Sequence, residues 1–521
     1  MKRLNIAFLA LFAVSALSAQ TVFEAAKFSN TDITGTARYM GVAGAFGALG
    51  GDVSAIKDNP AGLGVFRKSE ISFTMNGQLQ DSKSLWSNYK TSDSNYGASV
   101  DNVSLVFANK TWRADNGFSG LLSSNFSFGY NKLMNFNRTN IIDGNSMQAS
   151  ITDFMASFTG TSSVNDLEWD NYPQNGYSNP YQNPNLSWLS VMADYGRLMN
   201  PVYDANNQFT NWASLLDANE TVLPSYYLKE SGAVNEFSFG WSGNFNHKLF
   251  IGATLNLQTL YHDMVSVYSE QFSGGGDMKL INTLSTSGNG FNVNFGLIAV
   301  PVEYLRLGFS VHTPMFYRLE QVNYATMDFN TTVKGSTNTP ADNYVQYRYQ
   351  TPFQFNASAA FMAGDKGFVS AEYVYRNFQG MKMTDVDGYN FSDVNSDIDN
   401  MLDAVNTFKI GAEYRLTNNF SLRAGFANVS SVTNSEAQKV LSSTTVRTDT
   451  EYFTHNKTNY ITAGMGYREN NWYVDMAYTN RLLDEDYHAF NTNGFNETYQ
   501  VAPASVKTTN HRLVFTVGLR F

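Results

Sequence analysis

The sequence predicts an all-β protein, a transmembrane antiparallel β-barrel of about fourteen strands with an N-terminal hatch that plugs the lumen. Charged residues make up 15% of the 521 residues, whereas in soluble proteins their share is usually about a quarter. Aromatic residues make up another 15%. No apolar run long enough for a membrane helix follows the first twenty residues. Short segments alternate apolar and polar residues, as expected of a wall with lipid on one face and a lumen on the other.

Residues 1–19 have the features of a secretory signal peptide. Lys2 and Arg3 precede an apolar run (residues 4–17), and small residues follow it. The run is too short to span a bilayer, and we expect cleavage near Ala19. Removal of the two cations changes the formal net charge from −10 to −12.

Residues 20–68 are predicted to form the hatch. Glycine recurs at every third position in one part of this stretch, at Gly41, Gly44, Gly47 and Gly50. Each glycine destabilises a helix by about 1 kcal/mol, so the stretch needs packing partners outside itself, and a surrounding barrel would supply them. A turn motif follows, made of Asn59, Pro60, Ala61 and Gly62.

The last strand shows the alternation most clearly. Between His511 and the C terminus, one face carries Leu513, Phe515, Val517, Leu519 and Phe521, opposite Arg512, Thr516, Gly518 and Arg520. The same pattern predicts strands at 69–80, 101–110, 119–134, 232–247, 249–272, 288–300, 304–320, 343–363, 367–383, 405–416, 419–431, 458–468, 471–482 and 509–521. Twelve or sixteen strands remain compatible with it, because strand boundaries read from a sequence are imprecise.

Charged residues on the polar faces are expected to line the lumen, because an arginine facing lipid at mid-bilayer would cost about 2–4 kcal/mol. A guanidinium fork suits a ligand carboxylate, and four arginines are candidates for that role: Arg306, Arg376, Arg415 and Arg423. The alternative, which we favour for any single one, is that they pair with other charges of the wall and of the hatch and hold the plug. The charged hatch residues are Arg38, Asp52, Lys57 and Asp58.

Connections between the predicted strands alternate short and long, the rhythm of barrels with short periplasmic turns and long extracellular loops. Residues 81–100 are one predicted long loop. The longest, residues 135–231, is too long for a bare loop and should carry its own structure. Within it, Leu189, Met192 and Leu198 at roughly helical spacing predict a short helix. This insertion would cover the barrel mouth, either as a surface for ligand access or as a protective cap.

The N-terminal stretch resembles the hatch of the FadL/TodX (OmpP1) family of outer-membrane transporters. The resemblance rests on the Gly/Ala run from Ala43 to Ala48, on residues 52–56 and on residues 59–63, directly behind a signal peptide. The terminal aromatic Phe521 is similar to the carboxy-terminal signal of outer-membrane barrels. The resemblance implies a monomer surrounded by lipid in the outer membrane of a Gram-negative bacterium.

The resemblance also implies a function: passive transport of hydrophobic compounds, chiefly long-chain fatty acids, without a cofactor. In this family the ligand reaches a luminal pocket that touches the mature N terminus and leaves sideways through a gap at a kink in the third strand. Gly120 and Gly129 are the candidates for this lateral gate, since glycine can bend a strand or interrupt its ladder. An insertion in the second outward loop departs from the family pattern.

Enzyme and metal functions find little support in the sequence. The motif Gly-x-Ser-x-Gly does not occur, and the six histidines are scattered without metal-binding spacing. With no cysteine, the chain has no disulfide, lipoprotein anchor or thiolate metal site. We therefore expect no enzyme activity, no cofactor and no metal site, and an acidic chain is a poor candidate for nucleic-acid binding.

Alternatives to hydrophobic transport stay open. One is a structural or adhesive barrel that binds surfaces through its outward loops, and another is a water-filled porin for polar solutes. A haem receptor fits least, because such barrels have about twenty-two strands and a larger plug. The substrate also stays open among fatty acids, aromatic hydrocarbons, bile-derived lipids and haem.

Overall fold

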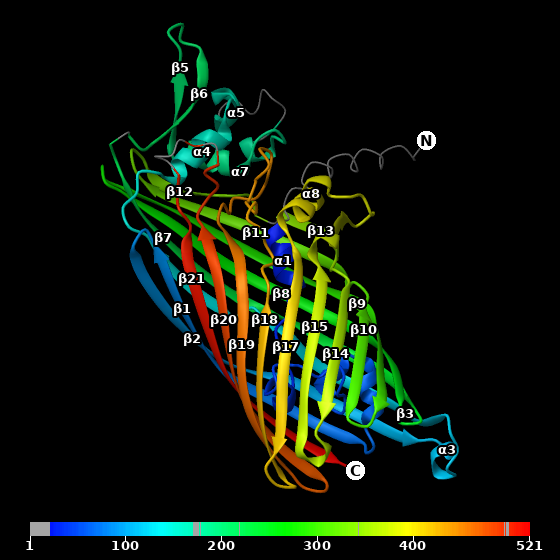
Figure 1. Cartoon of the computed structure of the whole chain (residues 1–521). Helices are drawn as coiled ribbons and strands as arrows, with labels where there is room; N and C mark the ends of the chain where they lie inside the picture. The colour runs from blue at the N-terminus through cyan, green and yellow to red at the C-terminus, as the bar shows by residue number, and fades with distance from the viewer. Residues whose placement is uncertain are drawn as a thin grey trace, which may run out of the picture.

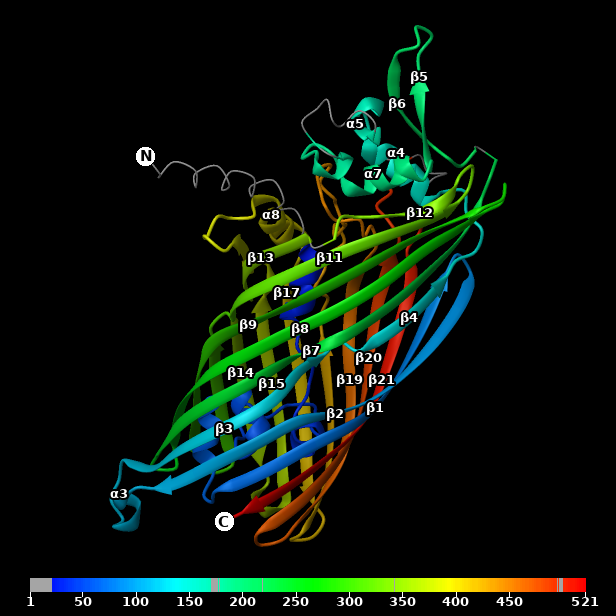
Figure 2. The same cartoon turned by 180° about the vertical axis from the view of Figure 1, so that it is seen from behind.

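The chain folds into a closed antiparallel barrel of 14 wall strands (Figures 1 and 2). The computed structural model describes residues 21–169, 177, 179–217, 219–341, 343–493, 495 and 500–521, so the predicted signal peptide lies outside the described residues. The wall closes because the last strand pairs with the first, from Glu70↔Arg520 to Leu85↔Ser505. The predicted fold class is confirmed.

The wall strands follow one another in chain order, and four wall positions are each built from two consecutive segments. In order they are β1 (Glu70–Trp86), β2 (Tyr89–Lys110), β3 (Leu121–Asn135) with β4 (Arg138–Asp143), β7 (Val222–Phe245), β8 (Leu249–Phe272), β9 (Asp277–Val302), β10 (Leu305–His312) with β11 (Phe316–Asn330), β13 (Asn343–Gln350) with β14 (Gln354–Met362), β15 (Gly367–Asn377) with β16 (Lys382–Asp385), β17 (Ala404–Arg415), β18 (Phe420–Val429), β19 (Tyr452–Arg468), β20 (Trp472–His488) and β21 (Ala504–Arg520). Pro314 and Pro352 stand in two of the interruptions, where a residue without an N–H cannot continue the ladder. We call the end with the C terminus the turn end and the opposite end the loop end.

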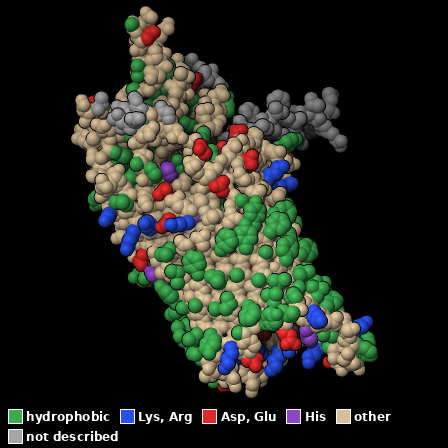
Figure 3. Space-filling model, in the orientation of Figure 1, with side chains coloured by type: hydrophobic (Ala, Val, Ile, Leu, Met, Phe, Trp, Pro, Cys, Tyr) green, Lys and Arg blue, Asp and Glu red, His purple; other side chains and the backbone are tan. Residues whose placement is uncertain are grey.

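Large apolar side chains cover the outside of the barrel toward the turn end, as Figure 3 shows for one face. On β21, Val517 and Leu519 are 49% and 54% exposed, whereas Thr516 is fully buried on the inner face. Charged wall residues such as Glu413 and Arg423 are buried inside. The assignment of inner and outer faces from the sequence is therefore confirmed for these strands, and the belt matches a lipid-facing surface.

Several strands continue past this apolar belt toward the loop end, where the sequence predicted loops. Residues 81–100 form a hairpin instead of a loop, because β1 runs to Trp86 and β2 begins at Tyr89. Ser87 and Asn88 make its two-residue turn with φ of 47° and 66°, the left-handed geometry that joins twisted strands. The outer face carries polar residues here, so no alternation of hydrophobicity marks the strands. The gap between the predicted strands 249–272 and 288–300 is shortened in the same way, because β9 begins at Asp277.

The long insertion is shorter than predicted, because β4 and β7 occupy both of its ends and leave residues 144–221 as the connection. Over the loop end it carries α4 (Ile151–Thr159), α5 (Val164–Leu167), η4 (Pro180–Gln182), α7 (Trp188–Tyr195) and the hairpin of β5 (Met199–Tyr203) and β6 (Phe209–Ser214) (Figure 1). The helix α7 confirms the predicted short helix. Its buried Leu189 and Met192 belong to an apolar cluster that also contains Tyr226 and Leu280 of the wall.

The remaining elements are short. They are α3 (Trp112–Asp115) and η5 (Gly364–Lys366) at the turn end, and β12 (Lys334–Asn338), η6 (Phe378–Gly380) and α8 (Ser392–Met401) toward the loop end. None of the helices described is at once long and apolar enough to cross a membrane.

The N-terminal stretch lies inside the barrel, where Figure 1 draws it in blue. It contains α1 (Val22–Ser29), α2 (Ala37–Met40), η1 (Val53–Lys57) and η2 (Pro60–Val65). We call residues 30–66 the luminal segment. Glycines of the wall make room for its backbone: a Cβ on Gly411 would lie 2.4 Å from the carbonyl oxygen of Val42.

Candidate functional site

The predicted hatch motif joins the luminal segment to the wall. Asn59 Nδ2 donates hydrogen bonds to the carbonyl oxygens of Gly47 at 2.7 Å and of Leu297 in β9 at 3.2 Å. Its Oδ1 accepts from the Ala61 N–H at 3.1 Å and so caps η2, which Pro60 begins. The Gly62 carbonyl accepts from the Gly51 N–H at 3.1 Å. Asn59, Pro60, Ala61 and Gly62 thus hold two turns of the segment together and against β9.

Ion pairs add further links between the luminal segment and the wall. Arg38 Nε lies 3.0 Å from Glu413, and Glu413 in turn lies 2.7 Å from Arg423 Nε. Arg423 also pairs with Asp475 at 2.6 Å, so both sides of this candidate guanidinium are occupied by carboxylates. Arg423 is therefore paired with other charges of the barrel, which is the alternative to ligand binding that the sequence left open.

The other three candidate arginines lie apart from Arg423. Arg376 is buried and donates to the carbonyl oxygen of Ser29 at 3.3 Å and to Thr31 Oγ1 at 3.2 Å, with no carboxylate partner among the described residues. Arg306 and Arg415 both lie at the turn end, where Arg306 donates to a backbone carbonyl and Arg415 is exposed. The structure does not bring the four together into one site.

The third wall strand is interrupted beyond the two predicted gate glycines. Gly129 pairs regularly with Ser104 of β2 and Ser238 of β7, and Gly120 precedes β3 with φ of 114°. The β2–β3 ladder ends at Asn102↔Asn131, although β2 continues to Tyr89 with β1 as its pairing strand. The backbone ladder between the two wall strands therefore stops at this point, and beyond it Thr91 Oγ1 of β2 accepts from the Asp143 N–H of β4 at 3.2 Å.

The break between β3 and β4 is supported from both sides. On the β7 side, Gly232 has φ of 131°, and its carbonyl oxygen accepts from the Phe136 N–H at 3.0 Å. On the luminal side, the Asp32 N–H donates to the Leu133 carbonyl at 3.0 Å, and Thr34 Oγ1 donates to the next carbonyl, that of Lys132. The luminal segment thus supplies hydrogen bonds where β2 no longer does.

A cavity of about 170 Å³ lies between this break, the helix α1 and the loop of residues 430–451, which enters the lumen from the loop end. Apolar and aromatic side chains of all three elements and of the wall line it, among them Phe23, Met134, Phe136, Met264 and Tyr452. One cavity therefore contacts both the first described residues of the chain and the interrupted strand.

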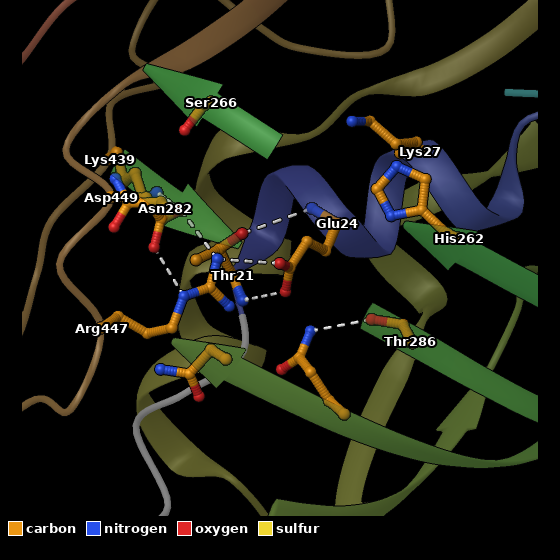
Figure 4. Close-up of polar contacts among 12 residues, drawn as sticks. Thr21, Glu24, Lys27, His262, Ser266, Asn282, Thr286, Lys439, Arg447 and Asp449 are labelled. Atoms are coloured by element: carbon orange, nitrogen blue, oxygen red, sulfur yellow. Dashed lines mark hydrogen bonds and ion pairs between the residues drawn. The ribbon is translucent and has the colours of Figure 1, made fainter. Parts of the chain in front are cut away.

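Charged residues surround this cavity in mutually paired clusters, and Figure 4 shows the one that contains Glu24, Arg447 and Asp449. Glu230 accepts hydrogen bonds from Lys27 of α1, from Arg138 of β4 and, at 2.8 Å, from His262 Nε2 when that nitrogen is protonated. On the opposite side, Arg447 Nη2 lies 3.0 Å from Glu24 of α1 and its Nε lies 2.6 Å from Asp449.

These clusters balance in charge. Arg447 and Lys439 hold the pKa of Asp449 well below its usual range, so this carboxylate stays ionised. Five lysines and arginines and five carboxylates line the cavity. The lining is amphipathic without a net charge and suits a largely apolar molecule.

Comparisons with known proteins bear on the fold. No protein-family model and no curated protein matches the sequence. Among solved structures, a FadL homologue of Pseudomonas aeruginosa is similar, with a TM-score of 0.51 and 12% identity over 95% of this chain and 99% of that chain. A TodX deltaS2S3 mutant, described as a monoaromatic hydrocarbon channel, has a TM-score of 0.52 and 12% identity over 94% of this chain and 99% of that chain.

The closed wall, its apolar belt and the N-terminal stretch inside it define the chain as a transmembrane β-barrel with an occupied lumen. Its fold is that of the FadL homologue and the TodX channel. At 12% identity the similarity establishes the fold alone.

Sequence reasoning missed two parts of the site. The break between β3 and β4 contains neither glycine nor proline, and its only sequence signal is Gly232 on the neighbouring strand, at the very start of a predicted strand. Residues 430–451 show no regular hydrophobic pattern in the sequence, so the sequence did not predict that Arg447 and Asp449 lie beside α1.

Proposed function

We propose that the chain is a FadL/TodX-like channel of the outer membrane of a Gram-negative bacterium, which passes hydrophobic small molecules without a cofactor. The observation that carries this proposal is the cavity that touches both α1 and the break in the third strand. In this proposal residues 1–19 are the signal peptide, residues 20–68 are the hatch, and the barrel acts as a monomer surrounded by membrane lipid.

The proposed route begins at the loop end, passes the cavity and leaves sideways between β2 and β3–β4. Lateral release avoids water, and an acyl chain gains about 0.8 kcal/mol for each CH₂ kept out of water. The gate in this route is the break around Met134 and Phe136, with Gly120 and Gly129 below it.

Long-chain fatty acids are the proposed substrates within this class. The apolar lining of the cavity would hold the chain. Arg376, which donates to the C-terminal end of α1 and lines a separate cavity of about 140 Å³, would receive the carboxylate, because it has no carboxylate partner among the described residues. A neutral hydrocarbon would need the cavity alone. Comparing labelled oleate with toluene, in wild type and in Arg376→Gln, separates the two: loss of oleate uptake only supports the acid.

Filling the cavity should stop transport. Met264→Trp adds a large ring to the lining, and we expect uptake of labelled oleate into cells to fall about tenfold or more, since the ring takes the volume of the ligand. Val265→Trp is the matched control, because Val265 is the next residue of β8 and faces outward. Equal uptake in both variants would remove this cavity from the route.

A charge placed in the strand break should block lateral release. Met134 lines the cavity at the break, so Met134→Asp puts a carboxylate where an apolar chain must pass, and we expect slower uptake with ligand still bound. Met134→Leu keeps an apolar side chain and should transport normally. Uptake by cells and mass spectrometry of co-purified ligand measure the two steps. Normal uptake in Met134→Asp would place the exit elsewhere.

An adhesive barrel is the second candidate, favoured by the β5–β6 hairpin that projects from the loop end in Figures 1 and 2. Deletion of residues 199–214 should abolish surface binding under that proposal and leave fatty-acid uptake unchanged under ours.

A further inference from the structure

A basic vestibule lies at the turn end of the barrel, next to the luminal segment. This cavity of about 510 Å³ is lined by seven cationic and two acidic side chains, in a chain whose formal net charge is −10. The cations are Arg38, Arg67, Lys68, Arg306, Arg415, Arg468 and Arg520. Such a local excess of one sign inside an acidic protein attracts ions of the opposite sign.

Two of these arginines share one aromatic ring, and one of the two also pairs with a carboxylate. The guanidinium carbons of Arg468 and Arg520 lie 5.3 Å and 5.1 Å from the ring centre of Tyr473. Glu70 accepts hydrogen bonds from the Tyr473 hydroxyl at 2.6 Å and from Arg520 Nε at 2.8 Å. Among the residues that the structure describes, Arg468 has no carboxylate partner.

Arg306 is in a similar position. Its Nη1 donates to the Leu49 carbonyl at 2.6 Å, and its buried Nε meets no acceptor in the described part of the chain. The charges that act on it most strongly are two further cations, Arg67 and Arg38. Partly buried like charges repel one another, and a bound anion would offset that repulsion.

The vestibule also joins two parts of the protein. Leu49, Gly50 and Gly51 of the luminal segment line it together with wall residues such as Arg306 and Arg468. The exposed aromatic residues Tyr304 and Trp472 lie on the outside of the barrel at this end, as at a membrane–water interface. An anion in the vestibule would therefore contact both the segment and the wall at the level of lipid head groups.

We propose that the basic vestibule is an anion site that binds a phosphate or carboxylate group through Arg306 and Arg468. Their planar guanidinium groups suit such oxyanions, which accept two parallel hydrogen bonds. The source of the group is either a soluble anion or the head group of an anionic phospholipid. Binding there stabilises the contact between the luminal segment and the wall, and it is separate from the apolar cavity beside α1.

The test uses the full chain in neutral detergent, with two probes. Inorganic phosphate is titrated against chloride at equal ionic strength, and the unfolding temperature of the barrel is followed. In parallel, native mass spectrometry counts retained phosphatidylglycerol against phosphatidylcholine. The variant R306Q/R468Q removes both arginines, and K83Q/K229Q removes two exposed cations of the outer surface as the matched control. Migration of unheated samples on gels verifies that each variant is folded.

We expect R306Q/R468Q to weaken anion binding about tenfold or more, because the variant loses the charge-assisted hydrogen bonds of both guanidinium groups, and the control to change it less than twofold. A shift caused by phosphate and lost in R306Q/R468Q assigns a soluble anion. Selective retention of phosphatidylglycerol, lost in the same variant, assigns a lipid head group. Absence of binding in both arms, or equal binding by R306Q/R468Q and wild type, overturns the site.

Discussion

Gly411→Val should drive the luminal segment from its position and open the barrel to ions. The new Cβ would lie 2.4 Å from the carbonyl oxygen and 2.6 Å from the Cβ of Val42, both far inside contact distance. The wall strand cannot yield easily, because Gly411 is paired with Ser370 on one side and Gly425 on the other. The segment has to move instead, and it is what occupies the lumen at this level.

Conductance in planar bilayers measures the result. Wild type should give little current, whereas Gly411→Val should give stable open steps. Gly77→Val is the control, because Gly77 is also in a wall strand and a Cβ there would meet no heavy atom within 4 Å. If Gly411→Val conducts no better than wild type, the segment adapts locally and is not what closes the lumen.

Among the substitutions proposed, Glu413→Ala should cause the largest loss in the free energy of unfolding. The buried carboxylate lies between Arg38 of the luminal segment and Arg423 of the wall, at 3.0 Å and 2.7 Å. Its removal leaves Arg38 without this partner, and breaking a buried pair in this way costs about 3–5 kcal/mol. Urea unfolding followed by circular dichroism measures the loss.

Two further variants make this test specific. Glu303→Ala removes an exposed carboxylate at the turn end and should change stability by less than about 0.5 kcal/mol. Combining Glu413→Ala with Arg38→Gln should recover part of the loss, because the uncompensated charge is then absent. Additive losses in the double variant would show that the two residues do not act as a pair.

The sequence predicted the barrel because lipid imposes a simple rule on the wall. Leu519 and Val517 must face the membrane and Thr516 must face inward, so alternation alone assigns their faces. The rule applies only to the part of the wall that lies in lipid. Beyond the belt most residues on both faces of β1 and β2 are polar, and the hairpin at Ser87 and Asn88 gave no such signal.

The sequence predicted the kind of residues that the candidate site contains, but not their positions. A charged residue such as Arg376 could be expected inside the barrel, but its height along the lumen depends on strand register and tilt, which a sequence does not give. The break at Phe136 depends on a hydrogen bond donated by Asp32, about one hundred residues earlier, and on one accepted by Gly232, about one hundred residues later. Contacts between residues so far apart in the sequence leave no local pattern in it.

The strands that continue past the apolar belt give the barrel a tall collar. On β8 the outward apolar residues reach Val265, and the strand goes on to Phe272, which at about 3.3 Å per residue and the tilt of barrel strands raises the rim by roughly 15–20 Å. In the proposed outer membrane this height corresponds to the sugar layer of the surface lipids. An oily molecule captured at the rim would cross that layer inside protein, shielded from the carbohydrate that otherwise keeps such molecules away from the cell.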